Sequence, residues 1–292
     1  MPTMRETPSK SKKVGNAEDI ILPSHANEAP STLGEYTICI YGDKGIGKST
    51  LASQFPDALT FMFEPQRSDV AIRQVPDYRR GEPLLTWDRY KKYLELVADD
   101  PKVKTVVIDN ADHAYFACVK YVEEANGWSD IGEPAYGHGW RELRKEWGVT
   151  NNALRYLMAS KPGGVIYTSH ARRRETTSLS GQQNDWVVPT CDDKCWDYLK
   201  TCPIAIYYGW RERHRVLHLT GTEDLWAGIP DGRFRDRKTG KPLQCLLAGA
   251  GPAETYKILL EGFANCLENF DPNPEVTAAA NAPVSLPKKG KK

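Results

Sequence analysis

Short, unbroken runs of apolar residues alternate along this chain with longer stretches in which apolar side chains recur every three or four positions. The runs predict buried strands, and the periodic stretches predict helices with one buried face. Strands are expected at about 36–41, 58–63, 104–109 and 164–168. Helices are expected directly after the first strand and at about 84–98, 111–125 and 140–159. Because strands and helices alternate, we expect an α/β fold with a mostly parallel central sheet covered by helices on both faces.

The pattern changes after His170. Residues 171–188 are polar and are predicted to form a loop. A short helix near 192–200, strands near 204–208 and 215–219, and a last helix near 253–270 are expected to follow. We expect these elements to form an antiparallel C-terminal extension of the same sheet and not a second domain.

Both ends of the chain are polar and rich in Pro, Ser or Lys. Residues 1–33 and 271–292 show no apolar periodicity and are predicted to be disordered tails around one domain at 34–270. The net charge of +1 conceals an asymmetry, because both tails are basic and the domain between them is net acidic. A globally basic nucleic-acid-binding protein is therefore excluded, and any contact with DNA must come from a local patch or from the tails.

The composition is that of an ordinary soluble protein, with 40% hydrophobic and 26% charged residues among 292. No apolar run is long enough to cross a membrane, and no apolar core follows the basic start as in a secretion signal. The seven cysteines are odd in number, so reduced thiols and a cytoplasmic location are expected.

The most specific motif is G-D-K-G-I-G-K-S, which matches the phosphate-binding P-loop pattern between a predicted strand and a predicted helix. Its glycines allow successive backbone N–H groups to surround phosphate oxygens at a helix N-terminus. Lys48 is expected to reach the β- and γ-phosphates of ATP, and the Ser49 hydroxyl to ligate Mg²⁺. The residues expected to bind the nucleotide are Gly42, Asp43, Lys44, Gly45, Ile46, Gly47, Lys48, Ser49 and Thr50.

Polar residues follow the other predicted strands at the edge where ligands bind in such sheets. Asp109 ends the third strand and is expected to hold Mg²⁺ together with Ser49. The alternative for Asp109 is an N-cap of the next helix, a role that Asn110 can also fill.

The candidate catalytic residues are Glu64, Lys48 and His170. Many ATPases place a glutamate directly after the metal-binding aspartate, but this chain has Asn110 there. Glu64, at the end of the second strand, is therefore predicted to activate the attacking water, with Asp112 as the weaker candidate. A solvent-facing glutamate is the alternative for Glu64.

His170 ends the fourth strand and is predicted to contact the γ-phosphate and to couple hydrolysis to the segment that follows. A purely structural histidine is the alternative.

Three consecutive arginines follow His170. Arg172, Arg173 and Arg174, with Trp186 nearby, suit a single-stranded DNA, whose backbone binds cations and whose bases stack on aromatic rings. Pairing with Glu175 and other surface acids is the alternative.

Two further patterns suggest weaker sites. The basic stretch 232–241 could supply an arginine finger to a neighbouring subunit. A zinc site built from Cys191, Cys195, His214 and His218 is disfavoured, because a predicted helix and a buried strand lie within the set.

Five segments of the chain carry a resemblance to a known family: the P-loop, F-M-F-E at Glu64, V-V-I-D-N at Asp109, V-I-Y-T-S-H at His170 and a late H-L-T-G-T-E-D-L-W-A-G-I-P-D-G-R segment. Together they resemble the phage-encoded RecA-like AAA-domain P-loop ATPases. Some of that group are single-strand annealing recombinases. The resemblance covers about 34–270 and implies ATP and Mg²⁺ as cofactors, and single-stranded DNA as partner. It also implies a homo-oligomeric ring or short filament, no membrane contact, and the bacterial host cytoplasm. A small-molecule kinase and a non-hydrolysing nucleotide switch remain as alternatives.

Overall fold

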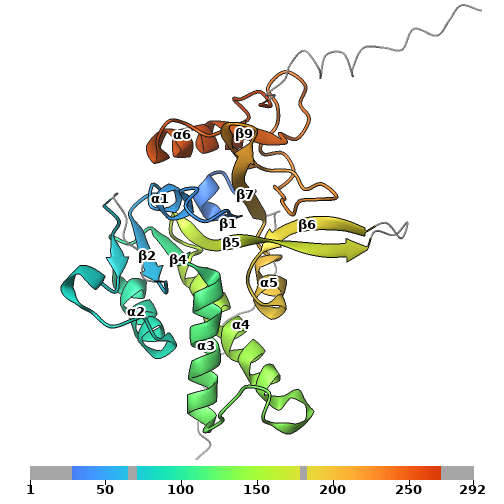
Figure 1. Cartoon of the computed structure of the whole chain (residues 1–292). Coiled ribbons are helices and arrows are strands. Elements are labelled where there is room, and N and C mark those ends of the chain that lie inside the picture. Colours follow the sequence, from blue (N-terminus) through green and yellow to red (C-terminus); the bar gives the residue numbers. More distant parts are fainter. Residues whose placement is uncertain (1–27, 65–70, 178–182, 271–292) are drawn as a thin grey trace, which may run out of the picture. The chain divides into compact units, whose positions relative to one another are not determined.

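The computed structural model describes residues 28–64, 71–177 and 183–270 (Figure 1). The chain divides into Met1–Pro30 and a compact unit that begins at Ser31, to which all elements below belong. Among the described residues, no helix is both long and apolar enough to cross a membrane.

One sheet runs through this unit, and its strands do not follow the order of the sequence. Six neighbouring strands, in the order β3-β2-β4-β5-β1-β7, are parallel, and β8 and β9 continue the sheet in antiparallel pairing. The strands are β1 (Thr37–Gly42), β2 (Ala58–Met62), β3 (Gln74–Val75), β4 (Thr105–Asp109), β5 (Gly164–Thr177), β6 (Gln183–Pro189), β7 (Ile204–Arg211), β8 (His214–His218) and β9 (Cys245–Leu247).

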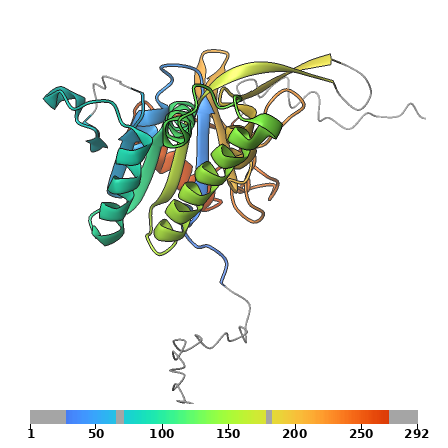
Figure 2. The same cartoon turned by 90° about the horizontal axis from the view of Figure 1, so that it is seen from below.

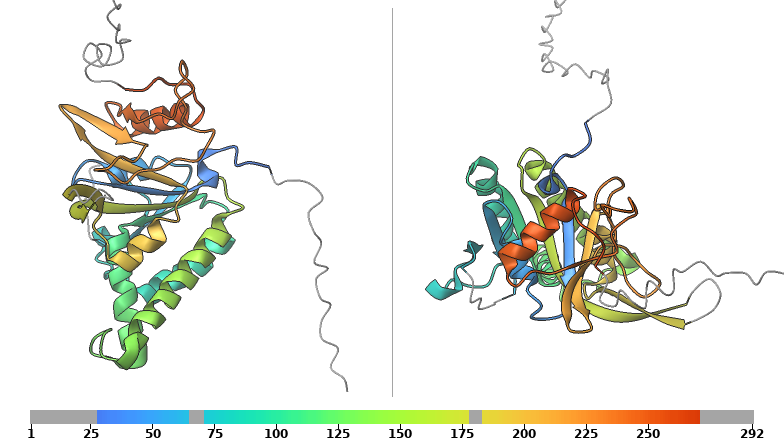
Figure 3. Two further views of the ribbon diagram at one scale, coloured as in Figure 1. Left: turned by 90° about the vertical axis from the view of Figure 1, so that its right-hand side faces the viewer. Right: turned by 90° about the horizontal axis from the view of Figure 1, so that it is seen from above.

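Helices cover both faces of the sheet, as Figure 3 shows for α6 on one side and α3 and α4 on the other. In β1, Ile38 and Ile40 belong to one buried cluster with the helices α1 (Lys48–Ala52) and α6 (Pro252–Phe263). Cys39 and Tyr41 belong to the cluster on the opposite face. The helices there are α2 (Trp87–Asp99), α3 (Ala111–Asn126), α4 (His138–Met158) and α5 (Asp193–Leu199).

The burial of both faces explains why the central strands are apolar at nearly every position. The predicted α/β architecture is therefore confirmed, including the antiparallel C-terminal strands. Within the described ranges, three short 3₁₀ helices are also present, at Leu33–Glu35, Tyr78–Arg80 and Ala135–Gly137.

The prediction of a polar loop at 171–188 was wrong. β5 continues past His170 and pairs antiparallel with β6, from Ala171 opposite Pro189 to Thr177 opposite Gln183. We call this two-stranded ribbon, Ala171–Thr177 with Gln183–Pro189, the arm; it extends away from the central strands (Figure 2). The described side chains of the arm mix exposed Arg173, Glu175 and Asp185 with buried Val188, so the segment lacks the continuous apolar run by which a buried strand is recognised.

Other boundaries differ more modestly from the predictions. β7 is parallel to β1, so the antiparallel part begins only at β8. The last helix ends at Phe263 and not near residue 270. The predicted end of α3 is confirmed, because Gly127 closes the helix with a φ of +70°, a conformation that glycine adopts without strain.

Candidate nucleotide site

The P-loop connects β1 to α1, as the sequence predicts. Gly47 is the N-cap of α1 and has a φ of +108°, which disfavours any residue with a side chain. Gly42 is required for a different reason, since a Cβ atom there would lie 1.9 Å from the carbonyl oxygen of Tyr208 on β7. The loop conformation is thus fixed by glycine at its start and at its end.

Lys48 is nearly buried, with 6% of its surface exposed. Its Nζ donates hydrogen bonds to the carbonyl oxygens of Gly42 at 3.0 Å and of Asp43 at 2.9 Å. Burial lowers the pKa of Lys48, and the negative charge of Asp109 opposes this effect. The ammonium group is therefore held against the loop that is expected to bind phosphate.

Asp109, at the end of β4, has one oxygen in use and one without a partner. Its Oδ1 accepts a hydrogen bond of 2.6 Å from the Thr168 hydroxyl on β5. Its Oδ2 is buried and makes no hydrogen bond of normal geometry among the described residues. Burial raises the pKa of Asp109, while the nearby Ser49 and Thr168 hydroxyls lower it.

This arrangement fits a divalent cation. A buried carboxylate oxygen without a partner is costly, and a Mg²⁺ ion bound to it beside the Ser49 hydroxyl would remove that cost. The alternative role for Asp109 is not observed, because Asn110 is the N-cap of α3 and accepts a hydrogen bond of 3.0 Å from the His113 backbone N–H.

Glu64 lies just after β2, at the centre of a hydrogen-bonded group. Its Oε2 accepts a hydrogen bond of 2.7 Å from the Asn110 amide and lies 3.3 Å from Nε2 of His170. The other ring nitrogen of His170, Nδ1, lies 3.4 Å from Nζ of Lys48. Because the Lys48 ammonium only donates, Nδ1 accepts and Nε2–H is left to donate to Glu64. The three predicted catalytic residues therefore come together, and Glu64 is not a free surface glutamate.

Asp112, the weaker candidate for the catalytic base, accepts hydrogen bonds from residues where the two strands of the arm leave the sheet. Its Oδ1 accepts from the Ser169 hydroxyl at 2.9 Å, and its Oδ2 accepts from the Thr190 hydroxyl at 2.6 Å and from the backbone N–H of His170 at 3.4 Å. Residues at the base of both strands of the arm are thus bound by one carboxylate in the first turn of α3. Since these donors use both oxygens of Asp112, the structure favours Glu64 as the base.

All three arginines of the arm have acidic partners within the chain. Asp193 on α5 accepts hydrogen bonds from Arg174 at 2.8 Å and from Arg172 at 3.3 Å. Arg173 points to the other face of the ribbon, where it lies 3.8 Å from Asp185 with 80% of its side chain exposed. The pairing alternative therefore holds for all three arginines, with Asp193 and Asp185 in place of Glu175 as the acids, and Arg173 is the one that keeps most of its side chain exposed.

The basic stretch 232–241 is largely engaged within its own subunit. Glu268 accepts contacts of 2.7 Å from both Arg237 and Lys238, and Arg235 lies 3.7 Å from Asp231. These contacts give the arginine-finger prediction no support.

The four residues of the disfavoured zinc set lie in two different surroundings. Cys191 and Cys195 are buried at the start of α5, whereas the two histidines lie on β8. The His218 ring packs 5.5 Å from that of Tyr207, and burial lowers its pKa to about 4. Within the described part of the chain, no group of three or more His, Cys, Asp or Glu side chains is arranged to hold a metal.

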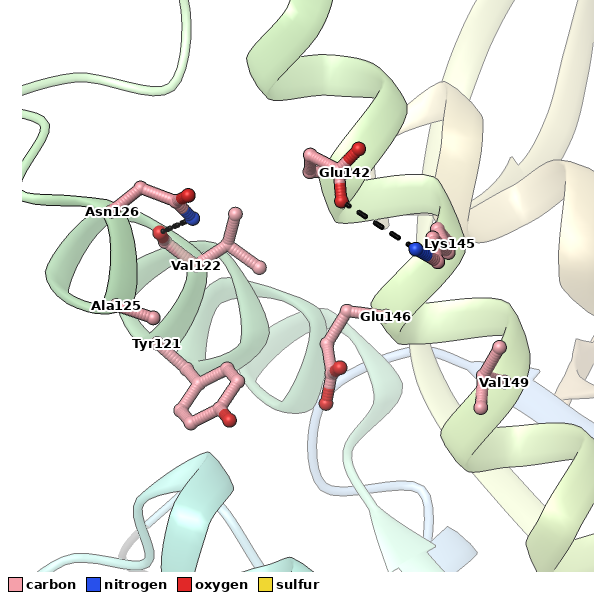
Figure 4. A pocket seen from close by; sticks show the side chains of 8 residues that line it. All are labelled: Tyr121, Val122, Ala125, Asn126, Glu142, Lys145, Glu146 and Val149. Carbon is pink, nitrogen blue, oxygen red and sulfur yellow. Dashed lines mark hydrogen bonds and ion pairs between the residues drawn. The ribbon is translucent and has the colours of Figure 1, made fainter. Parts of the chain in front are cut away.

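A hollow of about 260 Å³ lies between α3 and α4, away from the P-loop (Figure 4). Within it, Glu146 Oε1 accepts hydrogen bonds of 2.9 Å from Trp87 and from Lys91 on α2, so this carboxylate joins two helices. The lining residues are Tyr121, Val122, Ala125, Asn126, Glu142, Lys145, Glu146 and Val149. None of them belongs to the P-loop or to a strand end, so this hollow is not an acceptor pocket beside the γ-phosphate, as a small-molecule kinase would need.

Sequence reasoning missed two residues that shape the site, Thr168 and Thr190, and the contact that a third, Asn110, makes with Glu64. Thr168 orients Asp109, Thr190 joins the arm to Asp112, and the Asn110 amide holds Glu64. A polar residue inside the apolar run V-I-Y-T-S was the available signal for Thr168. Thr190 gave no comparable signal, because the strand to which it is attached was not predicted.

The glycine loop lies between strand β1 and helix α1, and the buried Asp109 ends β4, which is separated from β1 only by β5. This combination defines the protein as a P-loop nucleotide-binding protein. Residues 34–223 match the family described as AAA domain, and the chain belongs to that family. It therefore contains a P-loop ATPase domain of the AAA type, which confirms the broader part of the predicted resemblance.

Comparison with solved structures finds a likeness to the KaiC-like protein PH0186 from the hyperthermophilic archaeon Pyrococcus horikoshii OT3. The identity is 14% and the TM-score 0.40, over 76% of this chain and 88% of that chain. A likeness at this level carries no argument about function. No curated protein matches the chain at a significant level.

Proposed function

We propose that the protein is a Mg²⁺-dependent ATP hydrolase in which Glu64 activates the attacking water. The observation that carries the proposal is the connection of Glu64, through the His170 ring, to the P-loop lysine by contacts of 3.3 and 3.4 Å. A carboxylate held this close to the phosphate-binding lysine is suitably positioned to accept a proton from water beside the γ-phosphate.

Each residue of the site then has a defined task. Lys48 and the loop N–H groups bind the phosphates, and Ser49 and Asp109 hold the metal. Bound Mg²⁺ would supply positive charge to neutralise the phosphate oxygens as the terminal bond breaks. Glu64 accepts the proton of the water, and His170 is positioned to sense the γ-phosphate through the Lys48 contact.

The position of Glu64 favours hydrolysis over the two alternatives. A non-hydrolysing switch needs no carboxylate that is held between two hydrogen-bond donors and connected to the phosphate-binding lysine. A kinase needs a second substrate beside the γ-phosphate, whereas here the Glu64–His170 pair lies next to the P-loop lysine.

Phosphate release from ATP by the full chain tests this proposal. With excess Mg²⁺ the protein is expected to release phosphate steadily, and an excess of EDTA should reduce the rate to that of buffer alone. Adding Mg²⁺ in excess over the EDTA should restore the rate of phosphate release. Release of phosphate at an unchanged rate in EDTA would contradict the metal site at Ser49 and Asp109.

We further propose single-stranded DNA as the partner, in recombination or annealing of the phage type and in the cytoplasm of a bacterial host, with the protein acting as a homo-oligomeric ring or short filament. The resemblance of the motifs suggests this role, and the arm supports it. The arm extends from the central strands with Arg173 exposed, and His170 directly precedes it. Contact with the γ-phosphate at His170 would therefore act directly on the first residues of the arm.

Alanine at Arg172, Arg173 and Arg174 together is expected to weaken binding of single-stranded DNA and to flatten its salt dependence. Each phosphate that loses its cation should change the slope of log K against log salt by about 0.7. Fluorescence anisotropy at several salt concentrations measures both quantities.

The matched control removes exposed arginines elsewhere, with Arg141 and Arg144 on α4 changed to alanine. That variant should bind DNA as the parent does, and both variants should still bind ATP. If the triple variant keeps the parental affinity and slope, the arm is not the DNA site.

A further inference from the structure

The amide of Asn110 has a fixed orientation. Its Oδ1 accepts from the backbone N–H of His113 at 3.0 Å and lies 2.8 Å from Nδ1 of the His113 ring. A backbone N–H can only donate, so the oxygen of the amide must face the helix. The Nδ2 group is therefore turned outward, where it donates to Glu64 Oε2 at 2.7 Å.

Asparagine is the one common N-cap residue that can make both contacts. Asp and Ser cap a helix equally well, since each has an oxygen that accepts from the first turn. Asp has no N–H to donate and would place a negative charge against Glu64. Ser has a hydroxyl on a side chain one atom shorter, so its O–H does not extend toward Glu64 as the Asn110 Nδ2 group does. Asparagine at position 110 therefore serves both the cap of α3 and the hydrogen bond to Glu64, whereas Asp or Ser would be sufficient for the cap alone.

Asn110 is also held firmly. It is 1% exposed, it follows the metal-binding Asp109 at the end of β4, and it begins the 16-residue helix α3. Glu64, by contrast, lies outside the regular part of β2. The hydrogen bond from Asn110 thus connects the catalytic carboxylate to a rigid part of the domain.

We propose that Asn110 is a positioning residue for ATP hydrolysis: it ties the Glu64 carboxylate to the first turn of α3, in the place beside Asp109 where many ATPases have the catalytic glutamate itself. The inference rests on the proposed role of Glu64. It assigns Asn110 no contact with ATP or metal, so Asn110 variants should affect the rate of turnover and not nucleotide binding.

The decisive variant is Asn110→Ser, because serine keeps the cap and removes the contact with Glu64. We expect kcat to fall about 10- to 100-fold, since a misplaced catalytic group costs roughly that factor. The Kd for ATP and the melting temperature should stay near those of the parent. Asn110→Asp should also lose turnover, and its melting temperature should fall, because it places a buried negative charge against Glu64.

Asn110→Ala and Thr86→Ala separate capping from positioning. Thr86 caps a different helix, α2, through its hydroxyl, which accepts a hydrogen bond of 3.3 Å from the backbone N–H of Arg89. Loss of either cap should lower the melting temperature by about 2–4 °C. Only the Asn110 variant should also lose turnover.

A double variant distinguishes failure of this inference from failure of the proposed function. If Glu64 is the base and Asn110 acts through it, adding Asn110→Ser to Glu64→Gln should lower kcat no further. Parental kcat in Asn110→Ser, with Glu64→Gln inactive, would overturn the inference and leave the function intact. Parental kcat in Glu64→Gln would instead overturn the role of Glu64.

Discussion

Replacing Glu64 with glutamine is expected to lower kcat for ATP hydrolysis by about 10²- to 10⁴-fold, the usual contribution of a general base. Glutamine keeps the size of the side chain and can still lie beside Asn110 and His170, but it cannot take a proton from water. The affinity for ATP should change little, because the contact of Glu64 with the P-loop lysine runs through the His170 ring. Steady-state phosphate release and equilibrium titration with ATP measure the two effects.

The control for this substitution is Glu95→Gln, which makes the same chemical change at an exposed position on α2. It should retain the parental kcat and melting temperature. A Glu64→Gln protein that turns over ATP as fast as the Glu95→Gln protein would remove Glu64 from the mechanism.

Changing Lys48 to alanine is expected to weaken ATP binding by about 10- to 100-fold, which corresponds to the loss of a hydrogen bond to a charged group. The parent holds the Lys48 ammonium against the loop through two carbonyl oxygens, in a buried position that lowers its pKa. Lys48→Ala therefore removes the cation that is hydrogen-bonded to the P-loop backbone. The melting temperature should change little, because burial of the charge is itself unfavourable.

Lys92→Ala is the control for loss of a lysine, since Lys92 lies on α2 with 70% of its side chain exposed. Titration with a fluorescent ATP analogue compares the two variants. Equal affinity of Lys48→Ala and Lys92→Ala for the analogue would contradict the nucleotide site.

The sequence predicts the centre of this site well for a physical reason. A P-loop needs glycine, lysine and serine at fixed spacing, and parallel strands bring their carboxyl ends to one edge of the sheet. Glu64, Asp109 and His170 are far apart in the sequence, yet each could be assigned from the strand that it follows. The structure brings Glu64 and His170 together and places Lys48 beside them.

The arm could not be predicted in the same way. Arg172 to Arg174 alternate across a ribbon whose strands pair with each other, so no apolar face marks them as a strand. Their ion pairs with Asp193 and Asp185 depend on where α5 and β6 lie, which local sequence does not specify. The local sequence of residues 171–188 therefore predicts a polar loop whose three arginines are available to bind a partner.

The role of Asn110 shows another limit of sequence reasoning. Its capping function follows from its place before an amphipathic helix. Its hydrogen bond to Glu64 joins the ends of β2 and β4, and only the parallel pairing of these two strands makes that contact possible.

If Glu64 is the base, this AAA-family protein hydrolyses the ATP that it binds. A single-turnover experiment tests this most directly: labelled ATP is bound to excess full-length protein with Mg²⁺, the reaction is quenched at intervals, and the nucleotide is analysed. The parent is expected to convert bound ATP to ADP and phosphate without any added acceptor, while Glu64→Gln protein keeps its bound ATP intact. Intact ATP on the parent throughout, or equally fast conversion by the two proteins, would contradict the account.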